Sequence, residues 1–110
     1  MNRKTIVLTY EMEVLIKRIG NRIKKARLRR NIKAEVLAEQ AGISKGTLVS
    51  IEKGSPTVSI AGYAMVLYVL GIEKDLNLIA LDEEEKKKYR ETDLIQRKRA
   101  TKAQNKRLEI

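Results

Sequence analysis

The chain has 110 residues, a length that suits one domain with a small hydrophobic core. The chain has 24 lysines and arginines and 14 acidic residues, so its formal net charge is +10. This charge favours a polyanionic partner such as nucleic acid or an anionic membrane surface. The absence of histidine and cysteine removes the commonest catalytic bases, nucleophiles and zinc ligands, so we expect no enzyme activity, no metal and no cofactor.

The N-terminal segment, residues 1–9, is expected to be a strand or an arm. Residues 4–9, KTIVLT, are apolar and rich in β-branched side chains, which is typical of a short strand. A single strand would need a partner, either its own copy in a second subunit or another protein, and an unstructured arm is equally compatible with the sequence. The segment lacks a signal-peptide cleavage site, and with no cysteine in the chain we expect a cytoplasmic protein.

Residues 10–30 are expected to form the first helix, because apolar residues recur at helical spacing. The opposite face carries lysines and arginines of a single sign, which favours phosphate contact, particularly at Arg22 and Lys24. Asn31 can adopt the left-handed conformation that ends such a helix. The apolar face comprises Met12, Leu15, Ile16, Ile19, Ile23 and Ala26.

Residues 34–56 indicate two short helices joined by a tight turn. Gly42 interrupts the first helix, and Ser44 stands where the second helix needs an N-cap. Leu48 and Ile51 are three residues apart and therefore lie on one face. Helix, glycine turn, helix is the helix-turn-helix pattern, although a plain helical hairpin can produce a similar one. The core face of the first of these helices is predicted at Val36, Leu37 and Ala41.

The second half of the chain predicts two more helices and a charged tail. Residues 60–70 are apolar on nearly all sides, which is typical of a helix that is either central or shared with another chain. A last short helix is expected over residues 75–81, which closes a domain spanning residues 10–81. The tail, residues 82–110, has no core periodicity and is expected to be disordered alone or a lone, frayed helix.

Residues 20–70 resemble the phage-repressor-like (Cro/C1-type) helix-turn-helix family, also called the Xre family. The resemblance implies an all-α, five-helix, lambda-repressor-like DNA-binding domain, in which Arg27 pairs with Glu52. Members usually have Thr or Ser followed by Gln where this chain has Lys33 and Ala34, so Lys33 is expected to replace the phosphate contact of that glutamine. The motif residues are Arg27, Leu37, Ala38, Gly42, Ile43, Ser44, Ile51, Glu52, Lys53 and Gly54.

A helix-turn-helix places its second helix in the major groove, with the N-terminal residues of that helix toward the base edges. Lys45 can donate to guanine, and Thr47 offers a hydroxyl and a methyl group. Small exposed residues without a DNA role are the alternative interpretation of this helix. The predicted base contacts are Lys45, Gly46, Thr47 and Ser50, and the predicted phosphate contacts are Arg22, Lys24, Lys33 and Lys53.

Residues 55–80 resemble the corresponding part of HipB-like antitoxins, which implies a homodimer that represses its own operon and binds a HipA-like kinase toxin. We therefore predict a repressor that binds a palindromic operator in double-stranded DNA. One alternative is a prophage or mobile-element repressor without a toxin. Another is an interaction module that grips an acidic partner through its basic tail. A membrane-surface protein is disfavoured because the chain has no Trp and no Phe.

Overall fold

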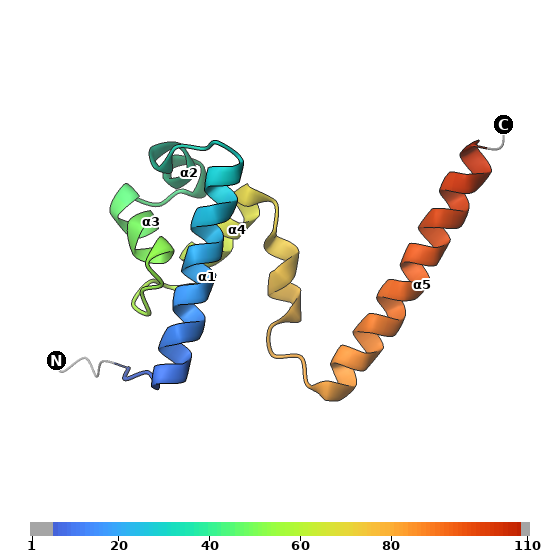
Figure 1. The fold of residues 1–110 in the computed structure, drawn as a ribbon, viewed down its shortest axis with the longest axis horizontal. Helices are drawn as coiled ribbons and strands as arrows, with labels where there is room; N and C mark the ends of the chain where they lie inside the picture. Colours follow the sequence, from blue (N-terminus) through green and yellow to red (C-terminus); the bar gives the residue numbers. More distant parts are fainter. Residues whose placement is uncertain (1–5, 109–110) are drawn as a thin grey trace. The chain divides into compact units, whose positions relative to one another are not determined.

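The computed structural model describes the backbone of residues 6–108 and the side chains of residues 6–92 and 94–99 (Figure 1). All regular structure in these residues is helical, as the sequence predicted. The described residues form two compact units, which divide between Leu76 and Asn77. The helices are α1 (Tyr10–Arg29), α2 (Ala34–Ala41), α3 (Lys45–Glu52), α4 (Ile60–Leu70), the 3₁₀ helix η1 (Glu73–Leu78) and α5 (Glu83–Leu108).

Each of the first four helices begins or ends at a residue whose chemistry fixes that boundary. The side chains of Thr9 and Ser59 accept hydrogen bonds from the first turns of α1 and α4. Gly42 and Gly71 end α2 and α4 in the left-handed conformation. Asn31 has a φ of 54° and follows α1, which is the left-handed conformation expected of it.

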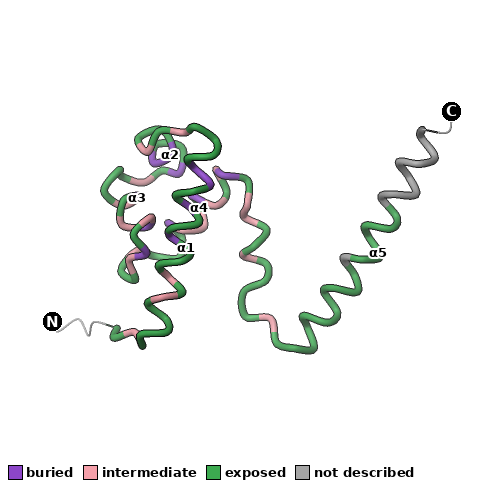
Figure 2. The backbone as a smooth tube through the Cα atoms, in the orientation of Figure 1, coloured by how far each residue is buried: buried purple, intermediate pink, exposed green. Residues whose placement is uncertain are grey.

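The hydrophobic core of the first unit lies where α1, α2, α3 and α4 meet. Its largest fully buried side chains come from all four helices, so no pair of helices could form it alone. Figure 2 shows this burial on the inward sides of the four helices, next to exposed outer turns. These side chains are Ile23, Leu37, Leu48, Ile51 and Val66.

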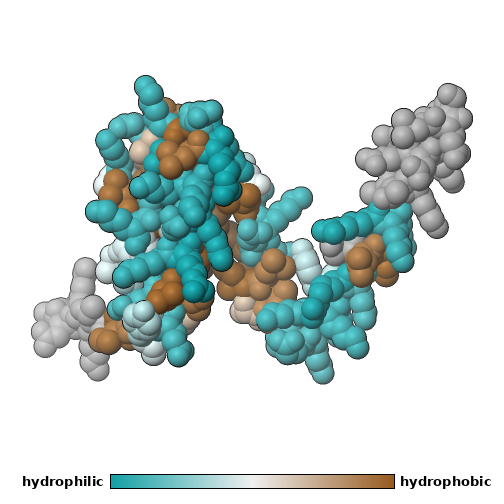
Figure 3. Space-filling view, in the orientation of Figure 1, coloured by the Kyte–Doolittle hydropathy of each residue, from teal (hydrophilic) through white to brown (hydrophobic). Residues whose placement is uncertain are grey.

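Two of the predicted apolar faces extend beyond the core. Met12, Leu15 and Ile19 are exposed on α1, because within the first unit the buried residues of that helix start only at Gly20. Val36 is also exposed, because α2 packs through Leu37, Ala38 and Ala41 instead. Figure 3 shows such apolar patches interrupting the hydrophilic surface of this unit.

The segments before α1 and after α4 can be compared with the predicted strand or arm and with the helix predicted over residues 75–81. Residues 6–9 are neither helix nor strand, and Val7 is 90% exposed. This agrees with an arm over those four residues. Lys4 and Thr5 lie outside the described residues, so a strand formed with a second subunit stays a prediction. The helix expected over 75–81 is instead the 3₁₀ helix η1, which ends before Ala80, a residue with a φ of 65°.

α5 is helical although none of its described residues is buried. Asp82 Oδ1 accepts from the backbone N–H of Glu85 at 2.9 Å and caps the helix. Glu83, Glu84 and Glu85 fill its first turn, while the charged residues that follow are mainly basic, which is the charge order that the helix dipole favours. Every side chain of α5 that the structure describes is exposed (Figure 2). The cap and the order of charges are local interactions that support this helix.

Candidate nucleic-acid interface

The turn between α2 and α3 has the geometry that a helix-turn-helix requires. Gly42 has a φ of 72°, and Ile43 donates its backbone N–H back to Ala38 O at 3.0 Å, which closes α2. Ser44 then begins α3, because its Oγ accepts from the backbone N–H of Thr47 at 3.1 Å. Three residues thus connect the two helices, which share the core through Leu37 and Leu48.

The outer face of α3 follows from the burial of its inner face. Leu48 and Ile51 are fully buried, and each helical residue is rotated by about 100° from the one before. Four residues then lie between roughly 100° and 200° from Leu48. These residues, which we call the outer ridge of α3, are Gly46, Val49, Ser50 and Lys53.

Val49 is a member of the outer ridge that is not among the predicted base contacts. Its side chain is 38% exposed, and an apolar side chain at this position can contact a thymine methyl group. The signal was available in the sequence, because Val49 lies three residues after Gly46 and four before Lys53. Gly46 itself has open space around it, with only Ser44 Oγ within 4 Å of an added Cβ.

Lys45 lies at the edge of the ridge and is engaged within the protein. Its Nζ is 2.6 Å from Glu35 Oε1 on α2, and both side chains are 59% exposed. The hydrogen bond from Lys45 lowers the pKa of Glu35, so the carboxylate stays ionised at neutral pH. A guanine contact by Lys45 therefore requires that the ammonium group exchange Glu35 for the base or bridge the two.

Thr47 lies at the other edge of the ridge. Its Oγ1 is 2.9 Å from Ser44 Oγ, and its backbone N–H donates to the same oxygen. The hydroxyl thus belongs to the cap of α3, and the methyl group is the part of Thr47 that remains for a base. Of the four predicted base contacts, Gly46 and Ser50 lie on the outer ridge, while Lys45 and Thr47 flank it.

The four predicted phosphate contacts are all exposed, but they do not share one surface. Gly20 of α1 lies against α3, since a Cβ on it would be 2.8 Å from Glu52 O. Lys24 is rotated about 40° from Gly20 and Arg22 about 160°, so Lys24 is on the α3 side of α1 and Arg22 on the other side. Lys17, rotated about 60° from Gly20, shares the side of Lys24 and was not selected from the sequence.

Lys33 precedes α2 and Lys53 follows α3, so they mark opposite ends of the helix-turn-helix. Lys33 occupies the N-cap position of α2 without a side-chain cap bond. A cation is unfavourable at this end of a helix dipole, whereas a bound anion there would be favoured by the dipole and by the lysine. The position of Lys33 therefore suits a phosphate contact.

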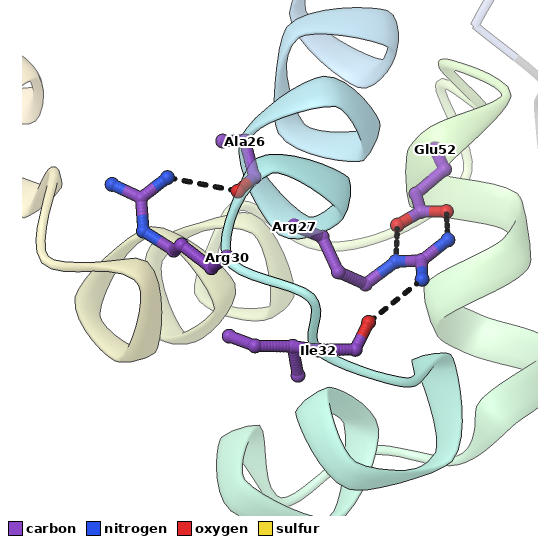
Figure 4. Close-up of polar contacts among 5 residues, drawn as sticks. All are labelled: Ala26, Arg27, Arg30, Ile32 and Glu52. Carbon is purple, nitrogen blue, oxygen red and sulfur yellow. Dashed lines mark hydrogen bonds and ion pairs between the residues drawn. The ribbon is translucent and has the colours of Figure 1, made fainter.

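Arg27 and Glu52 join α1 to α3 through a two-pronged ion pair (Figure 4). Arg27 Nε donates to Glu52 Oε2 at 2.8 Å and Nη2 to Oε1 at 3.0 Å, while Nη1 donates to Ile32 O at 3.0 Å. The two side chains are only 11% and 9% exposed. The hydrogen bonds to Glu52 raise the pKa of Arg27, so the guanidinium stays charged, and the paired hydrogen bonds hold α3 against α1.

Two further side chains hold the segments next to these helices. Arg30 Nη1 donates to Ala26 O at 2.8 Å at the end of α1 (Figure 4). The hydroxyl of Tyr63 on α4 donates to Ser55 O at 2.8 Å, and burial raises the pKa of Tyr63. The loop after α3 is thereby tied to α4, which keeps Lys53 at the end of a fixed helix.

Comparisons with known proteins agree with this geometry. Residues 23–61 match the helix-turn-helix family HTH_3. The matched segment runs from α1 through α2, the turn and α3 into α4, and thus includes every residue of the outer ridge. Together with the geometry, the match supports a DNA-binding transcriptional regulator.

A solved structure described as a "SinR protein/SinI protein complex" is similar to this chain. The sequences are 29% identical over 84% of this chain and 99% of that chain, with a TM-score of 0.49. No curated protein matches the chain. Within the described residues, no helix is long and apolar enough to cross a membrane, and no group of acidic residues is placed to hold a metal ion.

Proposed function

We propose that the protein is a transcriptional repressor that binds a palindromic operator as a homodimer. The observation that carries this proposal is the outer ridge of α3, held by a fully buried inner face within a segment that matches a helix-turn-helix family. Two such helices related by a two-fold axis would reach successive major grooves roughly 34 Å apart. The net charge of +10 supplies the attraction to phosphate.

The contacts divide into base and phosphate contacts by their place on the helices. Gly46, Val49 and Ser50 would face the bases, with Lys45 and the methyl group of Thr47 at the edges. Lys33, Lys53 and Lys24 would bind phosphates, which orient the protein without reading sequence. Arg22, on the other side of α1, would contribute long-range attraction only. A repressor of this kind acts in the cytoplasm, on the nucleoid.

The test compares operator DNA from upstream of the gene with random DNA of equal length, in a gel-shift titration. Replacing Lys45 and Thr47 by alanine should cost about 1–3 kcal/mol per lost base contact on the operator and much less on random DNA. Lys74→Ala, which removes an exposed lysine of η1, is the control for loss of one charge. Equal operator affinity for the double variant and the wild type would contradict the proposed readout.

Within α1, Lys24→Ala and Arg22→Ala form a matched pair, because both remove one exposed cation two residues apart. Lys24→Ala should weaken binding to both DNAs by similar factors and lower the salt slope by about 0.9. Arg22→Ala should change that slope much less. The reverse order would mean that the other side of α1 faces the DNA.

A narrower proposal assigns the repressor to a toxin–antitoxin pair with a HipA-like kinase. It is supported by the resemblance of residues 55–80 to HipB-like antitoxins and by the apolar side chains that this stretch exposes, among them Ile60 and Ile79. Co-expression with the product of the adjacent gene should yield a complex and relieve its toxicity. Operator binding without such a complex would favour a prophage or mobile-element repressor.

An interaction module for an acidic protein is the remaining candidate. Residues 86–107 carry ten basic and two acidic side chains, a net charge of +8 (10 − 2), which such a partner could neutralise. If neither operator nor random DNA binds at low salt, this candidate replaces the repressor.

A further inference from the structure

α4 differs from the other helices because it carries no charged side chain. Its sequence is IAGYAMVLYVL, within a chain of net charge +10. Val66 and Leu70 bury its inner side in the core, yet Tyr68 is 63% exposed and Met65 is exposed as well. Four residues, Ala61, Ala64, Met65 and Tyr68, lie within an arc of about 100° that points away from Val66. We call these four residues the outer face of α4.

We propose that the outer face of α4 pairs antiparallel with the same face of a second copy of this chain, around a two-fold axis between Ala64 and Met65. This deepens the proposed function, since it assigns the surface through which the homodimer forms. In such an isologous contact each residue meets its symmetry counterpart across the axis. Ala61 then lies opposite Tyr68 of the second copy, and Ala64 lies opposite Met65 of the second copy.

The outer face is complementary to itself in this register, because a small residue meets a large one at each level. A groove of about 490 Å³ adjoins Ala61, and Ile43, Val58 and Met65 line it between the turn of the helix-turn-helix and α4. The ring of Tyr68 from the second copy can enter this groove, where Thr57 and Ser59 provide hydroxyl groups for its phenol. A parallel arrangement would instead place Tyr68 against Tyr68 and leave both grooves empty.

The lack of charge on this face favours a second copy as the occupant. Two chains of net charge +10 repel each other, so they can associate most readily where neither presents a charge. The outer face of α4 meets this condition over the full length of the helix. Because one helix face buries less than the roughly 800 Å² per partner of a standard interface, we expect a weak dimer in the absence of DNA.

Cysteine cross-linking of the full chain tests the register, because the natural sequence has no cysteine. In Ala64→Cys the two sulfurs lie on either side of the axis and should form a disulfide under mild oxidation. In Ala61→Cys they are separated by about 10 Å along the helices, beyond the reach of a disulfide. Gln40→Cys, on the exposed side of α2, gives the background from collisions.

The expected result is a covalent dimer for Ala64→Cys at least tenfold above Gln40→Cys, with Ala61→Cys at background. Equal cross-linking of Ala61→Cys and Ala64→Cys would overturn the antiparallel register, and background levels for both would overturn the pairing itself. The cross-linking is measured without DNA, so it is independent of the operator titration. The pairing can fail while operator binding persists, and operator binding can fail while the pairing persists.

Sedimentation equilibrium provides a second measurement with natural side chains elsewhere. Tyr68→Arg adds a charge to the outer face and should raise the dimer dissociation constant at least tenfold. Tyr10→Arg makes the same change at an exposed tyrosine of α1 and should leave that constant unchanged. A dimer equally stable in both variants, or a wild type that stays monomeric at high concentration, would contradict the proposal.

Discussion

The two units of this chain are both helical, but different forces hold their helices in place. In the first unit, α1 to α4 share a core in which Ile23, Leu37, Leu48, Ile51 and Val66 are fully buried. In the second unit, α5 relies on the cap from Asp82 and on charges ordered along the helix dipole. A helix can therefore be specified by tertiary packing or by local interactions alone.

This difference determines what each unit can do with DNA. The core fixes the angle of α3 through Leu48 and Ile51, and the ion pair of Arg27 with Glu52 fixes it further, so side chains on the outer ridge keep one geometry. Base recognition requires such a geometry. The lysines and arginines of α5 whose side chains the structure describes are all exposed, which suits contact with phosphates and not the reading of bases.

The largest expected effect comes from breaking the ion pair that joins α1 to α3 in the first unit. Glu52→Ala leaves the guanidinium of Arg27 almost buried and uncompensated, which should cost about 3–5 kcal/mol of unfolding free energy. Operator binding should disappear with the fold. Thermal unfolding followed by circular dichroism measures the loss.

Glu39→Ala, on the exposed side of α2, controls for the removal of one glutamate and should unfold at nearly the wild-type temperature. Replacing both partners at once, as Arg27→Met with Glu52→Leu, should recover much of the stability because no charge remains buried. If Glu52→Ala unfolds like the wild type, the ion pair does not set the angle of α3.

A smaller loss should follow from Gly20→Ala on α1. The added Cβ would meet Ile51 O and lie 2.7 Å from Gly54 N, so α1 and α3 would have to separate. Overpacking of this kind costs about 1–3 kcal/mol, measured by urea unfolding. Gly46→Ala is the matched control, because Gly46 has open space and alanine should stabilise α3 by up to about 1 kcal/mol. Similar changes for both variants would contradict the close approach of α1 to α3.

Local signals were sufficient to predict most of the fold. Gly42 as a helix end and Ser44 as a cap fixed the boundary between α2 and α3, and the apolar run of residues 60–70 predicted α4, because these signals depend on neighbours within a few residues. Burial was harder to predict. The apolar spacing of Met12, Leu15 and Ile19 predicts a helix face, but it does not indicate which part of α1 the other helices cover and bury.

The candidate site was predictable only in part, for a similar reason. The inner face of α3 followed from the spacing of Leu48 and Ile51, which indicates its outer side. The bond between Lys45 and Glu35 joins two helices, so no pattern within either helix could reveal it. The spacing of two residues already puts Arg22 and Lys24 on opposite sides of α1. Which of the two lies on the α3 side needed the contact of Gly20 with α3, which is also tertiary.

The smallest expected effect on folding concerns the removal of α5. Deleting the residues after Leu81 should leave the melting temperature of the first unit nearly unchanged, because no side chain of α5 that the structure describes is buried. Differential scanning calorimetry of the truncated and full chains measures this. A large drop in melting temperature would show that the second unit contributes to the stability of the first.

The same truncation distinguishes two roles for the basic charge of α5. If its cations bind phosphates, operator and random DNA should lose affinity by similar factors, and the slope of log affinity against log salt should fall by about 0.9 for each lost contact. If the helix binds an acidic protein instead, both DNA titrations should be unchanged while that protein no longer co-purifies. Only the first outcome fits a division of labour in which α3 reads bases and α5 adds affinity without sequence preference. A selective loss on the operator would contradict that division, because cations without a shared core would then be reading sequence.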